Sequence, residues 1–220
     1  MQKTTSKPRD KGLQRAQTIG KILDAAEACF LERGVGGTSI DQMIKRAGIS
    51  KGNFFYYFKG KEDLTLQLTE RYFEREVALL NQLDEAAAAA SNDPLEQVLH
   101  VLMSLRKIYA ESLDRSPGCL YAVLVYEPEL VGSAVHRVTR KSVESWRKRF
   151  GDKLKAAMAI YPTRLLVDPA SVADQINAAF GGALLVSRIE RSPKLVAEQL
   201  DHSIHYLRLL FDRADPTKHH

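Results

Sequence analysis

The segment of residues 50–61 constrains the fold most strongly, because it places five consecutive aromatic residues between lysines just after a short amphipathic segment. In that preceding segment, apolar residues recur with the spacing of one helix face: Ile40, Met43, Ile44 and Ala47. Thr38-Ser39 can cap the first helix, Gly48 supplies a left-handed stop, and Ser50 can cap the next helix. The sequence therefore predicts a helix, a tight turn containing glycine, and a second helix.

A helix-turn-helix of this kind can place its second helix in the major groove of DNA. Residues at i and i+4 share a helix face, so Phe54 and Phe58 are expected to turn inward, against Phe30 and Ile44. The residues left facing outward are Asn53, Phe55, Tyr56 and Tyr57. A DNA-binding face can use tyrosine hydroxyls on phosphates and an apolar ring against thymine methyl groups, whereas a small aromatic core is the alternative explanation.

Further residues complete a specific pattern: Ile22-Leu23-Asp24-Ala25-Ala26, Phe30, Gly34, Thr38-Ser39, Ile44, Ala47-Gly48-Ile49-Ser50-Lys51-Gly52, Tyr56, Phe58, Lys59 and Lys61-Glu62-Asp63-Leu64. In this order and spacing, the chain from about Arg15 to Leu64 resembles the DNA-binding domain of TetR-type transcriptional regulators. The resemblance implies that Thr38, Lys51 and Lys61 contact phosphate. It also implies that the DNA-facing positions of the second helix are Gly52, Asn53, Phe55, Tyr56 and Tyr57.

Three positions depart from the residues that are usual in that family. The family often has Thr where Asn53 stands, Tyr where Phe55 stands, and His where Tyr57 stands. Phe55 lacks a hydroxyl for a phosphate, while the side-chain amide of Asn53 can pair with adenine. An operator sequence borrowed from a relative is therefore not expected to fit this chain.

The net charge of +5 is unevenly distributed along the chain. Residues 1–61 carry 12 Lys and Arg against 5 Asp and Glu, which gives +7, and residues 62–220 carry 20 against 22, which gives −2. Positive charge concentrated on the helix-turn-helix segment favours the release of counterions from DNA phosphates. An anionic membrane is the alternative partner, but the first helical segment lacks the long, Trp-bearing apolar face typical of interfacial helices.

The opening residues 1–17 are polar and charged, and no later run approaches the length of a membrane span, so we expect a cytoplasmic protein. We expect four parts in the chain. A flexible basic arm spans 1–14, the helix-turn-helix domain 15–61, a ligand-binding and dimerisation domain 62–213, and a tail 214–220.

Beyond Lys61, helix-breaking signals are sparse: Ser91-Asn92-Asp93-Pro94, Ser116-Pro117-Gly118, Glu127-Pro128, Tyr161-Pro162, Asp168-Pro169 and Ser192-Pro193. Most of these prolines indicate helix starts, and no alternating strand pattern lies between them. A long helix is expected from Lys61 to about Ala90, with Glu62 and Asp63 complementing its N-terminal dipole. The fold class expected is all-α, with an N-terminal three-helix helix-turn-helix domain and a larger C-terminal helical bundle that forms a dimer interface.

The last two helices are expected at residues 168–190 and 192–213. Their apolar stripes could be core or interface: Ile176, Phe180 and Leu184, then Leu200, Ile204, Leu207 and Phe211. The pair Gly181-Gly182 favours an interface, because glycines in mid-helix cost stability and admit close backbone approach. In the family that the chain resembles, these two helices form a four-helix dimer bundle, which implies a homodimer with Ile176, the glycine pair and the last stripe in its interface.

The resemblance also implies an apolar cavity for a small-molecule effector in the second domain. The candidate lining residues are Phe73, Met103, Leu105, Tyr109, Tyr121, Tyr126, Trp146, Phe150 and Phe180, each of which could equally be core. Glu127 and Glu129 could meet a cationic ligand, although solvated charges flanking Pro128 are the simpler interpretation.

Catalytic and metal-binding motifs are not apparent. His202 and His205 lie three residues apart with Glu198 upstream, but no third ligand follows at motif spacing, so neither a metal nor another cofactor is expected. Cys29 is expected in the core, and Cys119 at a helix start is either a small apolar residue or a redox-sensitive thiol.

These observations predict a ligand-responsive transcriptional regulator, in particular a repressor that a small molecule releases from a palindromic operator of double-stranded DNA. No catalytic residue is expected. The alternatives are an all-α enzyme and an architectural protein that binds DNA without sequence preference.

Overall fold

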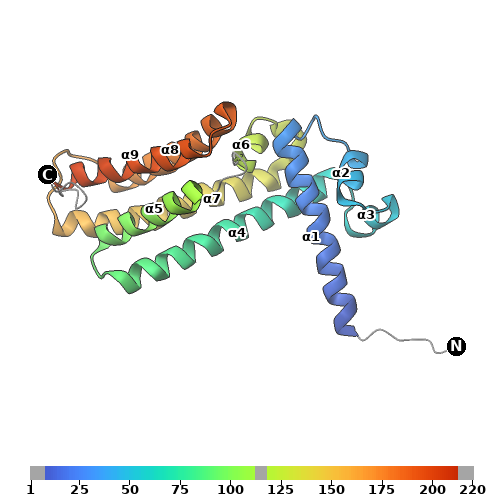
Figure 1. Ribbon diagram of the computed structural model, residues 1–220, viewed down its shortest axis with the longest axis horizontal. Coiled ribbons are helices and arrows are strands. Elements are labelled where there is room, and N and C mark those ends of the chain that lie inside the picture. The colour runs from blue at the N-terminus through green and yellow to red at the C-terminus, as the bar shows by residue number, and fades with distance from the viewer. Residues whose placement is uncertain (1–7, 112–117, 213–220) are drawn as a thin grey trace. The chain divides into compact units, whose positions relative to one another are not determined.

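The computed structural model describes residues 8–111 and 118–212 (Figure 1). Every regular element in these ranges is a helix: α1 (Pro8–Arg33), α2 (Ile40–Ala47), α3 (Lys51–Tyr57), α4 (Lys61–Ala90), α5 (Pro94–Glu111), α6 (Leu120–Val125), α7 (Pro128–Ile160), α8 (Pro169–Glu190) and α9 (Lys194–Leu210). The all-α prediction is confirmed. Helix α7 is interrupted at Gly132, whose φ of 70° is not helical.

The predicted caps of the helix-turn-helix are present. Ser39 begins α2 with a capping box, in which its hydroxyl accepts the Gln42 N–H at 3.2 Å and the Gln42 side chain accepts the Ser39 N–H at 2.7 Å. Gly48 ends α2 at φ 66°, a left-handed conformation that residues with a Cβ rarely adopt. The Ser50 hydroxyl then accepts the Asn53 N–H at 3.2 Å and starts α3. Local sequence signals therefore fix both helices and the turn between them.

The chain divides into two compact units, and the first consists of residues 1–72 and 120–138. Its hydrophobic core is formed by residues from α1 to α4, α6 and the start of α7: Ile22, Leu23, Ala26, Cys29, Phe30, Val35, Met43, Phe54, Phe58, Leu64, Leu68, Leu120, Leu124, Val131 and Val135. Phe54 and Phe58 are fully buried in it, as predicted, beside Phe30 and the partly buried Ile44. The packing of Cys29 in the core is confirmed as well.

Three of the expected domain boundaries differ from the structure. The first unit extends to residue 72, so residues 62–72 belong to it and not to the second domain. Helix α1 begins at Pro8, so residues 8–14 are helical and do not belong to a flexible arm. The segment 120–138 folds with the helix-turn-helix unit, although it was expected in the second domain, because Leu120, Leu124, Val131 and Val135 pack into the core around Phe30. Sequence position alone does not reveal this return of the chain.

The second unit consists of residues 73–119 and 139–220. Helix α9 packs against both α5 and α8, and Figure 1 shows α8 and α9 side by side. The core of this unit includes Trp146, Phe150 and Leu154 of α7, together with apolar residues from α5, α8 and α9. As predicted, α4 spans Lys61–Ala90 and prolines stand at the starts of α5, α7 and α8. None of the described helices is long and apolar enough to cross a membrane.

Most of the residues expected in a dimer interface lie in the core of the second unit. Those buried side chains are Ile176, Leu200, Ile204, Leu207 and Phe211. Their helical spacing is the same for a core stripe and for an interface stripe, so the sequence could not separate the two. Their assignment to the interface is therefore corrected: they hold α8 and α9 within one protomer.

Candidate functional site

Helix α3 presents a polar and aromatic outer face. Lys51, Gly52 and Asn53 are exposed, Phe55 is half exposed, and Tyr56 is 77% exposed. This face exists because the opposite side of the helix is anchored by two buried phenylalanine rings in the core of the first unit.

The outer aromatic side chains are held by their neighbours in the chain. The ring of Phe55 lies edge-on to that of Phe54 with centroids 5.2 Å apart, and Tyr56 lies edge-on to Tyr57 at 4.9 Å. Tyr57 itself is half buried and packs against the core of the first unit, so it is less accessible than expected. Ordered rings lose less conformational entropy when a partner binds.

Lys51 is also available on this face. Its ammonium lies 3.3 Å from the Asp41 carboxylate, and both side chains are exposed. An exposed ion pair contributes about 1 kcal/mol or less. A phosphate could therefore replace Asp41 at little cost.

Thr38 and Lys61, both expected on phosphates, use their polar groups inside the first unit. Thr38 is only 1% exposed, and its hydroxyl donates to the carbonyls of Gly34 at 2.8 Å and Cys29 at 3.2 Å. The neighbouring Ser39 is the exposed cap, so the phosphate contact assigned to the Thr38 hydroxyl is corrected. The sequence shows two adjacent hydroxyls but not which one faces solvent.

The Lys61 side chain is half buried, and its ammonium donates to the carbonyl of Val35. Burial lowers the pKa of Lys61, and the nearby Glu127 carboxylate opposes that shift. The ammonium therefore serves first to hold the turn between α1 and α2, and a phosphate role for it is secondary.

Glu127 is a residue whose role the sequence did not indicate. Its carboxylate accepts backbone N–H groups from Val35 and Gly36, more than ninety residues earlier in the chain, and so it is not simply a solvated charge. No local pattern could have identified this contact, because its partner is a backbone turn that offers no side-chain signal.

Four of the expected effector-binding residues meet in the second unit. Trp146 stacks on Phe150 and on Phe180 with both centroid distances at 5.3 Å, and Phe180 lies edge-on to Tyr109 at 5.4 Å. The indole N–H of Trp146 donates to Glu76 at 2.7 Å. Burial raises the pKa of Tyr109 to about 12, so its hydroxyl remains protonated at neutral pH.

The remaining effector candidates divide into two groups. Leu105 is buried in the core of the second unit, and Phe73, the first residue of that unit, is half buried. Three others do not join the aromatic cluster: Met103 is exposed on α5, Tyr126 is 80% exposed, and Tyr121 belongs to the first unit, where it lies edge-on to Tyr72. Aromatic or apolar character alone did not distinguish these positions.

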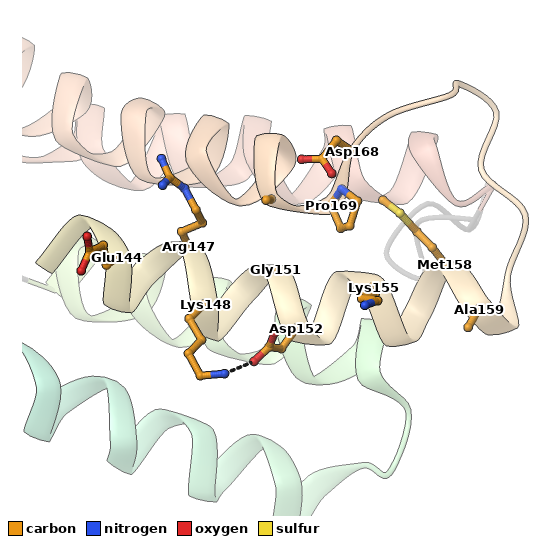
Figure 2. A pocket seen from close by; sticks show the side chains of 11 residues that line it. Glu144, Arg147, Lys148, Gly151, Asp152, Lys155, Met158, Ala159, Asp168 and Pro169 are labelled. Carbon is orange, nitrogen blue, oxygen red and sulfur yellow. Dashed lines mark hydrogen bonds and ion pairs between the residues drawn. The ribbon is translucent and has the colours of Figure 1, made fainter. Parts of the chain in front are cut away.

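A separate open cleft of about 920 Å³ lies between α7 and the start of α8 (Figure 2). Gly151, Met158 and Pro169 contribute to its lining, and the Lys148 ammonium and the Asp152 carboxylate pair at its edge at 2.8 Å. None of the expected effector residues lines this cleft. Among the described residues, no group of three or more His, Cys, Asp or Glu side chains could hold a metal ion.

The glycine pair lies on the outside of α8. Gly182 is exposed and Gly181 half exposed, and an added Cβ at either position would meet open space in the protomer. Three large apolar side chains follow on the exposed part of this helix: Leu185, Val186 and Ile189. On α9 the apolar side chain of Leu209 is also exposed. An apolar outer face of α8 thus accompanies the glycines.

The comparisons with known proteins agree with this architecture. The sequence profile of the bacterial regulatory proteins of the tetR family matches residues 22–68. The chain is 24% identical to the HTH-type transcriptional repressor DhaR of Mycobacterium sp. (strain GP1), over 89% of this chain and 91% of DhaR. It is 26% identical to the transcriptional regulator AcuR of Cereibacter sphaeroides, over 74% of this chain and 72% of AcuR.

Solved structures share the fold. A TetR-family transcriptional regulator from Agrobacterium tumefaciens is 20% identical and superimposes with a TM-score of 0.73, covering 87% of this chain and 98% of that one. The capped helix-turn-helix and its exposed α3 face define a helix-turn-helix DNA-binding protein. The chain belongs to the TetR family of bacterial regulatory proteins, and it is a transcriptional regulator.

Substitutions at two adjacent positions of α3 should distinguish a residue that anchors the helix in the core from a residue that contacts DNA. Phe54→Ala removes a fully buried ring and should cost about 3–5 kcal/mol of stability. Phe55→Ala removes a half-exposed ring and should cost about 1 kcal/mol or less, while weakening DNA binding. Urea unfolding followed by circular dichroism, with fluorescence anisotropy on labelled duplex DNA, measures both. Equal destabilisation by the two substitutions would contradict the inward and outward assignment.

Proposed function

We propose that the chain is a homodimeric repressor that binds an inverted-repeat operator through α3 and is released when a small molecule binds its second unit. The observation that carries this proposal is the outer face of α3, where Asn53, Phe55 and Tyr56 are exposed above a buried aromatic anchor. DhaR, a relative over most of the chain, is named a transcriptional repressor, which supports the direction of regulation.

Each exposed group on this face suits a different part of DNA. The Asn53 amide can donate to and accept from adenine in the major groove, and the Phe55 ring suits a thymine methyl group. The Tyr56 hydroxyl, the Lys51 ammonium and the Ser39 hydroxyl suit phosphates. Because base contacts carry specificity and phosphate contacts carry affinity, the two groups of residues should respond differently to substitution.

Asn53→Ala should cost roughly 1–3 kcal/mol on the operator and little on random DNA. The phosphate-contact control, Lys51→Ala, should weaken both DNAs about equally and lower the salt slope by about one unit. Duplexes selected by the chain itself from a random library supply the operator for titration by fluorescence anisotropy. Equal losses on both DNAs for Asn53→Ala would remove this residue from base contact, and failure to select any consensus would favour an architectural protein.

The proposal of a dimer rests first on the small number of base pairs that one short helix can contact. A single α3 contacts too few base pairs for useful specificity, whereas a two-fold dimer doubles the site. The outer face of α8 supports this part of the proposal, because Gly182 allows close approach and Leu185 and Ile189 supply apolar area. This face replaces the buried stripes as the proposed interface.

Gly182→Leu should convert the dimer to a monomer, because a bulky side chain would stand at the closest approach of two copies. The substitution should not disturb the protomer, since an added Cβ at Gly182 meets open space. Light scattering at micromolar concentration measures the change. Ala156→Leu, at an exposed position of α7, is the matched control and should remain dimeric. A dimeric Gly182→Leu variant with native operator affinity would place the interface elsewhere.

The aromatic cluster of the second unit is the proposed region for the effector. Trp146 and Phe150 are buried, Phe180 and Tyr109 are partly buried beside them, and both carboxylate oxygens of Glu76 already accept hydrogen bonds, from Trp146 and Ser142. Surroundings of this kind favour a small, largely apolar molecule. The effector can release DNA only by preferring the conformation that binds DNA poorly.

Small apolar compounds that change the emission of Trp146, the only tryptophan, should weaken operator binding. A coupling of about 1–3 kcal/mol corresponds to a change of roughly 5- to 150-fold in operator affinity. By reciprocity, operator DNA must weaken the compound by the same factor, which calorimetry with and without operator measures. Equal affinities in the two titrations would show that the compound is not the effector.

A further inference from the structure

The turn between α1 and α2 is held by a residue that lies far away in the sequence. Oε1 of Glu127, between α6 and α7, accepts the backbone N–H of Val35 at 2.8 Å, and Oε2 accepts that of Gly36 at 2.6 Å. Both partners belong to the first unit. A carboxylate shared between two N–H groups makes charge-assisted hydrogen bonds, which are stronger than neutral ones.

The turn is shaped to admit this carboxylate. Gly34 has a φ of 76°, and a Cβ built there would lie 2.5 Å from Oε1 of Glu127. A Cβ at Gly36 would lie 2.9 Å from Oε2. Both glycines therefore leave room for the Glu127 side chain against the backbone.

The backbone of this turn also accepts a hydrogen bond from the first residue of α4. The carbonyl of Val35 accepts the Lys61 ammonium, at the first residue of α4, and also the N–H of Thr38 at 3.2 Å. The N–H and C=O of this one buried residue are thus bound by an acidic and a basic side chain from two different parts of the chain. Water could satisfy the N–H of the exposed Gly36, so the Glu127 contact is not needed merely to avoid an unpaired group.

Both parts of the chain that hold Val35 lead into the second unit. Helix α4 starts at Lys61 and continues past residue 72, and α7 starts just after Glu127 and continues past residue 138. Helix α2 begins at Ile40, shortly after the turn. The turn that precedes the helix-turn-helix is therefore held by residues at the starts of two helices that continue into the second unit.

We propose that Glu127 is a positioning residue for DNA binding, which fixes the α1–α2 turn and thereby the placement of α2 and α3 against the operator. This inference rests on the proposed function, because it assumes two helix-turn-helix units that must match the spacing of two half-sites.

The first measurement is amide hydrogen exchange in the full-length, isotope-labelled chain. Glu127→Ala should accelerate exchange at Val35 and Gly36 by about tenfold or more, since both hydrogen bonds are lost. Glu127→Gln should have a smaller effect, because the NH2 group that replaces one carboxylate oxygen cannot accept a hydrogen bond, while the remaining oxygen still accepts one. Glu129→Gln, at an exposed position two residues further on, is the matched control and should exchange like the wild type.

The second measurement is operator affinity as a function of half-site spacing. The wild type should lose affinity on the order of tenfold for each base pair added or removed between the half-sites. Glu127→Ala and Glu127→Gln should flatten this dependence to roughly threefold, whereas a purely destabilising change would lower all affinities together. Glu127→Gln preserves the side-chain shape, so it remains informative should the alanine variant fail to fold.

Unchanged exchange at Val35 and Gly36, or an unchanged spacing profile in the folded glutamine variant, would overturn the positioning role. A wild type that shows no spacing preference would contradict the proposed dimeric function before any variant is made. The two failures are therefore distinguishable.

Discussion

The burial of Phe54 and Phe58 is the packing interaction on which the DNA-binding surface depends. Helix α3 has seven residues, and an isolated helix of this length is not stable in water. Two rings from one side of the helix enter the core beside Phe30 and Met43, so tertiary packing supplies the stability that the helix itself lacks. The helical period then turns Phe55 and Tyr56 outward, so the same anchoring that stabilises α3 also orients these two side chains.

The features that could be predicted from the sequence are those with local causes. Ser39 and Ser50 cap helices through N–H groups three residues away, and Gly48 ends α2 because its conformation excludes most side chains. The limits of α4 and the helix starts at prolines follow from similarly short-range rules. The outward face of α3 was predictable for the same reason, because it follows from the helical period once Phe54 and Phe58 are assigned to the buried side.

The features that could not be predicted depend on partners distant in the chain. The apolar residues of the stripe containing Ile204 and Leu207 would have the same spacing in the sequence whether they packed against α5 or against a second protomer. Only the fold shows that they are core residues. The hydroxyl of Thr38 and the ammonium of Lys61 turn inward because each donates a hydrogen bond to a backbone carbonyl of the first unit. Polar residues in a motif thus divide between surface and interior according to contacts that spacing does not encode.

This division changes how the positive charge of the N-terminal segment should be understood. Its excess of 12 basic over 5 acidic residues suggests a strongly basic surface, yet Lys61 is half buried and its ammonium is bound to a carbonyl. Counterion release depends on the cations that neutralise phosphates, not on net charge. Around α2 and α3, exposed Lys45, Lys51 and Lys59 fit that role, so fewer charges act on DNA than the composition implies. Lys61 instead stabilises the unit that presents them.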